Sequence, residues 1–260
     1  MLRAVAGGGA PPTADFEVGY VGPDGTQTRV TLADAMLVRF EQTRPVRTFP
    51  SYKRQRYFPG LWWSATTGRH VGYESWLERD HLMVLDVDPT IVGIASQPFW
   101  LHWQDDDKRS HSHVPDYVAR RLDGGAVVVD CRPLERIKPR DAAAFEATRQ
   151  ACELVGWDYR LVGTPDPVTV ANLRWLAGYR PPRHHLLDTA TALRAAFTEP
   201  MSLMVGADLA GDPIAVLPVL YHLLWRQELV ADLTVPLHGG TLVHLGRTCG
   251  RGPTVGVADR

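Results

Sequence analysis

The spacing of hydrophobic residues in the middle of the chain changes from a helical period to a strand period. Residues 73–85 have a helical pattern, with Leu77, His81 and Val84 on one stripe and Glu74, Glu78, Leu82 and Leu85 on an adjoining one, and the predicted helix ends at Asp88-Pro89. Residues 92–103 are then apolar and aromatic enough for one or two strands. Two further apolar segments, 111–122 and 126–132, flank an Asp-Gly-Gly turn and predict a β-hairpin.

Helical spacing returns after this hairpin. Residues 141–155 predict a helix that closes on Gly156, and a short strand is expected at 158–162. Asp166 is suited to cap a further helix, because the proline that follows it favours a first helical position. This order of helices and strands indicates the α/β class.

A stretch rich in proline, arginine and histidine at 180–185 interrupts these elements and predicts a domain boundary. Beyond it, helices at 189–197 and 214–228 precede a hairpin across Gly239 and Gly240, which is the outline of a winged helix. A helical cap is the alternative. We expect four parts: an N-terminal extension with a hairpin and a short helix at 1–44, a central domain at 45–180, a small winged-helix-like domain at 186–248, and a tail at 249–260.

Composition narrows the class of protein. With 45% hydrophobic residues and a net charge of -1, the 260-residue chain is globular and has no overall attraction to nucleic acid or anionic lipid. Its longest apolar run, 214–224, is shorter than the roughly 20 residues of a membrane span, so we expect no membrane partner. Residues 1–12 lack the apolar stretch of a signal peptide, and three scattered cysteines fit no disulfide framework. We therefore expect a cytoplasmic protein.

One segment departs from this even charge. Residues 42–73 contain no acidic side chain, and basic residues alternate there with aromatic ones. Lys53, Arg54 and Arg56 are candidates for contacts with DNA phosphates, beside aromatic side chains that can stack on bases. The alternative is that the aromatic residues pack beneath the central domain while the charges face water.

The candidate chemistry lies in acidic residues around the predicted hairpin. Asp116 follows a proline on one strand, and the sequence Asp130-Cys131-Arg132 lies fourteen residues later on the next, with Glu78 on the preceding helix. This spacing is close to a PD-(D/E)xK site. Carboxylates and the carbonyl of Cys131 would give Mg²⁺ the oxygen ligands that it prefers, and the cation would activate water against a phosphodiester.

The same residues have ordinary structural explanations. Pro-Asp often begins a turn, and an Asp near an Arg is often a surface ion pair. A Ser three residues before Glu78 indicates a capping box, which would leave Glu74 as the substitute carboxylate. The hairpin register also matters: a two-residue loop would set Asp116 opposite Cys131, whereas the three-residue loop 123–125 that we favour sets it opposite Arg132.

Two longer stretches carry a resemblance. YESWLERDHLMVLDVDPTIVGIASQPF at 73–99 and HVPDYVARRLDGGAVVVDCRP at 113–133 resemble the endonuclease subunit of heteromeric cut-and-paste transposases, the TnsA family, over about residues 45–180. The resemblance implies a restriction-endonuclease-like core, a mixed sheet flanked by helices. It implies nicking of double-stranded DNA at the 5′ ends of the transposon with Mg²⁺, for which Mn²⁺ would substitute. The implied partners are an RNase H-like transposase and an ATPase regulator.

Carried onto this sequence, the resemblance makes Glu78 and Asp116 metal ligands and puts Asp130 at the third acidic or amide position. Arg132 stands where the family has lysine. An arginine cannot act as a general base, although it can orient water or offset phosphate charge. This departure leaves open a catalytically weak or inactive nuclease fold that binds DNA or assembles partners. A free-standing repair or restriction-type nuclease, with the same chemistry but other partners, is a further alternative. Zinc binding by His102, His111 and His113 is disfavoured, because no zinc motif surrounds them.

Overall fold

The computed structural model describes residues 16–47 and 58–246 of the chain. It is a mixed α/β protein with several sheets, as the sequence predicts. By its internal contacts the chain divides into two compact units. The first contains residues up to 60, 71–74 and 93–164, and the second contains 61–70, 75–92 and the residues from 165 onward. The second unit thus includes segments that were expected in the central domain; the domain boundaries themselves stay a prediction.

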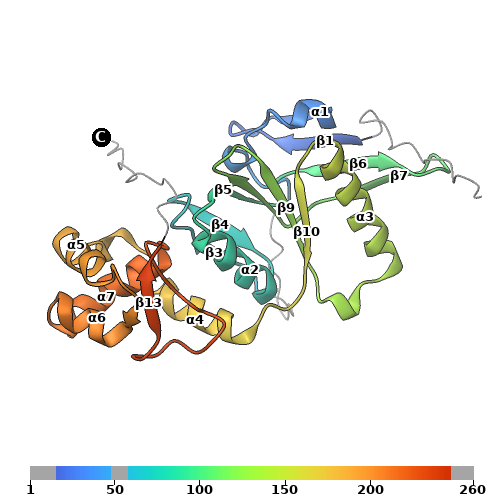
Figure 1. Ribbon diagram of the computed structural model, residues 1–260. Coiled ribbons are helices and arrows are strands. Elements are labelled where there is room, and N and C mark those ends of the chain that lie inside the picture. The colour runs from blue at the N-terminus through green and yellow to red at the C-terminus, as the bar shows by residue number, and fades with distance from the viewer. Residues whose placement is uncertain (1–15, 48–57, 247–260) are drawn as a thin grey trace, which may run out of the picture. The chain divides into compact units, whose positions relative to one another are not determined.

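One sheet of the first unit has four antiparallel strands in the order β2-β1-β6-β7 (Figure 1). These strands are β1 (Phe16–Val21), β2 (Gln27–Thr31), β6 (Trp100–Gln104) and β7 (Ser110–His113). The expected N-terminal hairpin is β1 and β2, and the short helix α1 (Leu32–Ala35) follows it. Because β1 pairs with β6 as well as with β2, this hairpin is an integral part of the sheet.

The second four-stranded sheet has the order β10-β9-β8-β5 and is mixed. Its strands are β5 (Ile91–Ser96), β8 (Tyr117–Arg121), β9 (Ala126–Cys131) and β10 (Asp158–Val162). β8 and β9 are antiparallel, whereas β9 and β10 are parallel and are joined by helix α3 (Pro139–Leu154), which lies alongside β10 (Figure 1). Every residue of β9 is buried, as expected for an inner strand covered on both faces.

Two segments that were expected to be continuous strands each pass from one sheet to the other. The segment 92–103 forms β5 and β6, and 111–122 forms β7 and β8. The first break is at Gln97, whose φ of 46° lies in the left-handed region, directly before Pro98. The second break includes Pro115, which has no N–H to donate to a ladder. Hydrophobic alternation alone does not reveal such a change of sheet.

The hairpin of β8 and β9 has a three-residue loop, but not at the expected position. Arg121 N donates to Gly125 O and Gly124 N donates to Arg121 O, so the loop is Leu122-Asp123-Gly124. The predicted loop 123–125 was therefore wrong by one residue. Gly124 has a φ of 90° and supplies the left-handed residue that this loop type requires. The register pairs Tyr117 with Val129, and its continuation sets Asp116 opposite Asp130 rather than Arg132.

The second unit contains five helices among its described residues and a three-stranded antiparallel sheet in the order β11-β13-β12 (Figure 1). The helices are α2 (Trp76–Val87), α4 (Pro167–Ala177), α5 (Leu187–Ala196), α6 (Leu203–Ala210) and α7 (Pro213–Trp225), and the strands are β11 (Met201–Ser202), β12 (Leu229–Ala231) and β13 (Leu242–Leu245). A further two-stranded sheet pairs β3 (Gly60–Trp63) with β4 (His70–Tyr73). Leu220, Leu223 and Trp225 of α7 are almost fully buried, so this helix is central to the unit's core.

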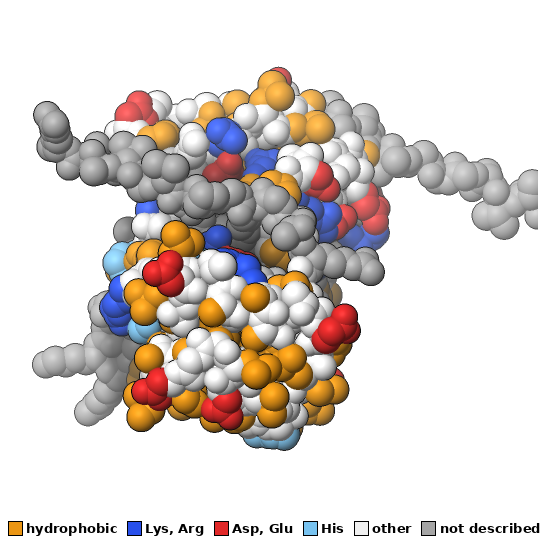
Figure 2. Space-filling view, turned by 60° about the vertical axis from the view of Figure 1, so that its left-hand side comes forward, with side chains coloured by type: hydrophobic (Ala, Val, Ile, Leu, Met, Phe, Trp, Pro, Cys, Tyr) orange, Lys and Arg blue, Asp and Glu red, His pale blue; other side chains and the backbone are white. Residues whose placement is uncertain are grey.

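The surface of the second unit is rich in hydrophobic side chains. Exposed examples on or beside its helices are Leu187, Val205, Leu209 and Ile214. The face of this unit shown in Figure 2 carries many hydrophobic and few basic side chains. No single helix in the described part of the chain is long and apolar enough to cross a membrane; α6 and α7 reach that length together but are bent by 119° at their junction.

Candidate active site

Asp116 lies in the bend that leads from β7 into β8. Its side chain is buried, with 5% of the residue exposed, and its Oδ2 accepts a hydrogen bond of 2.7 Å from Cys131 N. Its backbone carbonyl accepts a second bond of 2.9 Å from Gln97 N. Asp116 is therefore fixed both to β9 and to the segment between β5 and β6.

Asp130 lies on β9 and is even more deeply buried, at 1% exposed. His113 Nε2 lies 2.8 Å from Asp130 Oδ1, and the hydroxyl of Tyr159 donates to Asp130 Oδ2 over 2.9 Å. Burial, together with this carboxylate, raises the pKa of Tyr159, so the phenol stays protonated and keeps its donor. Both oxygens of Asp130 thus have protein partners.

Arg132 is exposed and follows directly on β9. Its backbone N donates to Val162 O over 2.9 Å, which extends the pairing of β9 with β10. Its guanidinium Nη1 donates to the carbonyl of Cys131 over 3.3 Å. The Cys131 carbonyl, which the sequence predicts as a metal ligand, therefore lies beside the Arg132 side chain.

Glu78 lies in the first turn of α2, which belongs to the second unit, whereas Asp116, Asp130 and Arg132 belong to the first. Ser75 caps this helix, because its Oγ accepts from Glu78 N over 3.2 Å. The same hydroxyl donates to Glu78 Oε1 over 2.8 Å. Glu78 is 5% exposed, so the capping interaction expected from the sequence holds a buried carboxylate.

Glu74, the substitute carboxylate, has two different partners. Its Oε1 accepts from Gln97 Nε2 over 2.9 Å, and its Oε2 lies 3.2 Å from Arg47 Nη2. All three residues belong to the first unit. Glu74 therefore connects the end of β4 to Arg47 and to the bend at Gln97.

The three histidines have separate environments. His111 Nε2 lies 2.8 Å from Asp105 Oδ2 at the tip of the β6-β7 hairpin, and His102 stacks against Trp100 with ring centroids 6.3 Å apart. His113 contacts Asp130 as described. Within residues 16–47 and 58–246, no group of three or more His, Cys, Asp or Glu side chains is placed to hold a metal ion.

Sequence reasoning identified Asp116 and Asp130 but missed the residues that hold them. Tyr159 comes from β10, 29 positions after Asp130, and Gln97 precedes Asp116 by 19 positions. No local pattern connects these pairs. The Gln-Pro dipeptide at 97–98 was the available signal, because a residue before proline is restricted and often marks a bend.

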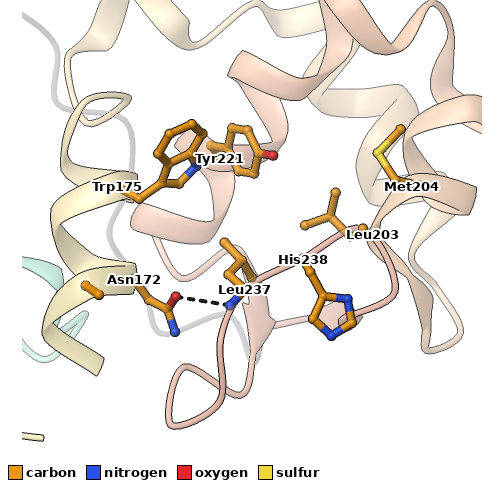
Figure 3. Close-up of a pocket in the computed structure, with 9 residues that line it drawn as sticks. Asn172, Trp175, Leu203, Met204, Tyr221, Leu237 and His238 are labelled. Atoms are coloured by element: carbon orange, nitrogen blue, oxygen red, sulfur yellow. Dashed lines mark hydrogen bonds between the residues drawn. The ribbon is translucent and has the colours of Figure 1, made fainter. Parts of the chain in front are cut away.

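A second candidate feature is an open groove of about 340 Å³ in the second unit (Figure 3). Trp175 of α4 and Tyr221 of α7 line it and meet edge to face, with ring centroids 6.0 Å apart. Asn172, also of α4, holds the loop that supplies Leu237 to the lining, because its Nδ2 donates to Leu233 O and Val235 O and its Oδ1 accepts from Leu237 N. Among the described residues, those that line this groove include no lysine or arginine. The candidate DNA contacts Lys53, Arg54 and Arg56 lie outside the residues that the structure describes.

A mixed sheet in which a Pro-Asp bend leads into a hairpin and an Asp-x-Arg strand defines the core of a PD-(D/E)xK nuclease. Residues 88–163 match the family model described as TnsA-like endonuclease N terminal, which confirms the resemblance found in the sequence. Residues 88–163 are therefore similar to the N-terminal domain of TnsA-like endonucleases, and the match suggests a nuclease subunit of a transposase. The matched residues include Asp116, Asp130 and Arg132, whereas Glu78 precedes them. No curated protein matches the chain.

Proposed function

We propose that this protein is the Mg²⁺-dependent endonuclease subunit of a heteromeric transposase and hydrolyses a phosphodiester at the 5′ ends of the transposon. The main support is the match to TnsA-like endonucleases together with the buried carboxylate of Asp116 at the Pro-Asp bend. A buried carboxylate is costly unless it is hydrogen-bonded or binds a cation, which is why it suggests a functional site.

The donor atoms suit magnesium in kind, because Mg²⁺ binds oxygen ligands and usually one or two carboxylates. Asp116 and the carbonyl of Cys131 would hold the cation, with Mn²⁺ able to replace it, and Glu78 stays the further ligand that the resemblance implies. The metal would supply charge neutralisation at the phosphate and a more acidic bound water. Asp130, at the third acidic position, fits less well because both of its oxygens already have partners.

Arg132 would act on the phosphate and not as a base. A guanidinium stays protonated throughout the physiological range, so it can donate hydrogen bonds to phosphate or water but cannot take a proton. Its hydrogen bond to Cys131 O keeps the guanidinium beside the carbonyl that we propose as a metal ligand. We therefore propose that Arg132 stabilises the negative charge that develops on the phosphate during cleavage.

For residues 186–248 we propose a winged-helix-like domain that docks a protein partner. Support comes from the order of its elements, α5-β11-α6-α7-β12-β13, with β13 between the other two strands. Residues 195–225, which include α6 and α7, contain no lysine or arginine, so these helices are poorly suited to bind phosphates. The partner would be the RNase H-like transposase or an ATPase regulator. Its hydrophobic side chains would enter the groove beside Trp175, since exposed tryptophans often dominate protein interfaces.

DNA contact is assigned instead to the basic and aromatic segment with Lys53, Arg54 and Arg56, and we expect the protein to act in the cytoplasm. A second candidate function is a weak or inactive nuclease fold that assembles partners on DNA. Two observations favour it: arginine replaces the usual lysine at position 132, and Asp130 is bonded to His113 and Tyr159.

Calorimetric titration of Mn²⁺ into the full chain, with and without duplex DNA, separates these functions. The Asp116→Asn variant removes the charge but keeps an acceptor for Cys131 N, so it should fold and lose metal binding. Asp106→Ala, at an exposed position in the β6-β7 turn, is the matched control and should bind as the wild type does. If neither the wild type nor the control binds Mn²⁺ in the presence of DNA, the assembly function is favoured.

A further inference from the structure

Two side-chain bonds tie a four-residue bend to adjacent positions of β9. At the start of the bend, His113 Nε2 lies 2.8 Å from Asp130 Oδ1. At its end, Asp116 Oδ2 accepts from Cys131 N over 2.7 Å. Since Asp130 and Cys131 are neighbours, the first and last residues of the bend are held by consecutive residues of one strand.

The bend needs such support because it joins two sheets. His113 ends β7 in one sheet and Tyr117 begins β8 in the other, and Pro115 between them has no N–H to donate. The Asp116 backbone makes its own bond to Gln97 N. The direction of the Asp116 carboxylate therefore depends on the His113 bond, the Cys131 bond and the Gln97 bond acting together.

Asp130 is placed to serve this bend. It is 1% exposed, and Tyr159 from β10 occupies the oxygen that His113 does not. His113 in turn packs edge-on against Phe145 of α3, with ring centroids 5.6 Å apart. Moving the Asp130 carboxylate to a metal would leave the partly buried groups of His113 and Tyr159 without this partner, which is unfavourable.

We propose that Asp130 is a positioning residue: it fixes Asp116 through His113 and is not itself a ligand of the metal. The proposal rests on the proposed nuclease function and revises the role that the sequence predicts for the third acidic residue. Partners that orient a metal ligand typically change metal affinity 10- to 100-fold when they are removed, whereas loss of a direct carboxylate ligand removes most binding.

The test is a double-mutant cycle on Mn²⁺ affinity in the full chain. Asp130→Asn and His113→Gln should each weaken binding about tenfold, and the double variant should bind about as well as either single variant, because both changes break one connection. Asp116→Asn should abolish binding. His111→Gln is the matched control, since His111 lies on the same strand and contacts an exposed-hairpin carboxylate, Asp105.

The proposal is overturned if His113→Gln leaves affinity unchanged while Asp130→Asn abolishes binding as Asp116→Asn does, or if the two effects multiply to about a hundredfold.

A readout without metal keeps the proposal separate from the nuclease function. In EDTA, hydrogen exchange of the Cys131 amide should be about tenfold faster in Asp130→Asn and in His113→Gln than in the wild type. The double variant should exchange at the same rate as either single variant. His111→Gln should exchange at the wild-type rate. If the wild type binds no Mn²⁺ even with DNA, the nuclease function fails, and Cys131 exchange alone decides whether Asp130 positions Asp116. Unchanged Cys131 exchange in a folded Asp130→Asn would overturn the positioning role.

Discussion

The side chains of the candidate site are held in place by partners that lie far away in the sequence. Asp116 and Asp130 could be found from their spacing, because a Pro-Asp and an Asp-x-Arg on neighbouring strands form a recognisable pattern. Tyr159 could not, because only the parallel pairing of β9 with β10 brings it to Asp130. The motif therefore predicts the carboxylates, and the fold decides how each of them is used.

Burial limits the chemistry of the cysteine thiols that the structure describes. Cys131 and Cys152 are buried free thiols, and burial raises the pKa of Cys152 to about 12. A thiol with so high a pKa carries almost no thiolate at neutral pH and is a poor nucleophile or metal ligand.

At the residue scale, Arg132 gives a direct prediction. Arg132→Lys should retain nicking of transposon-end DNA in the presence of the transposase, because a cation remains beside the Cys131 carbonyl. Arg132→Ala should lower the rate by about 100-fold, the usual effect of removing one donor that stabilises developing charge. Arg136→Ala, in the next exposed turn, is the control. Equal rates for the lysine and alanine variants would exclude Arg132 from the cleavage step.

At the scale of elements, the sequence predicts most helices and misplaces the strand boundaries. The helices expected at 141–155 and from Pro167 are α3 and α4, because capping residues and periodicity are local signals. The expected strands 92–103 and 111–122 each divide between two sheets, which alternating hydrophobicity cannot show since it continues on both sides of each break. The misplaced hairpin loop has a similar cause: either glycine of the turn could adopt positive φ, and Gly124 does.

Asn172 supports a testable feature at this scale, the loop between β12 and β13. Asn172, 7% exposed, makes three side-chain hydrogen bonds to the backbone of residues 233–237. Asn172→Ala should lower the free energy of unfolding by about 2 kcal/mol, because partly buried backbone groups lose their partners. Thermal unfolding of this variant and of the exposed neighbour Ala171→Ser measures the effect. Equal stability of both variants would show that water replaces the asparagine without cost.

At the scale of the whole molecule, charge is distributed unevenly although the chain is nearly neutral. Basic residues concentrate at 42–73 without an acidic residue among them, whereas residues 195–225 contain no lysine or arginine. A nuclease must hold a polyanion, and a transposase subunit must also hold proteins. The proposed DNA-binding and partner-binding segments thus differ in charge, which the net charge of -1 does not reveal.

This separation predicts how DNA affinity responds to salt. Each phosphate contact that is lost lowers the slope of log affinity against log salt by about one, because fewer counterions are released on binding. The double variant Arg54→Glu/Arg56→Glu should therefore bind duplex DNA more weakly and with a slope smaller by about two. Lys108→Glu/Arg109→Glu changes the net charge equally in the exposed β6-β7 turn and should keep the wild-type slope. If both double variants weaken binding alike, net charge rather than local contact governs the affinity, and the segment with Lys53, Arg54 and Arg56 does not touch the DNA.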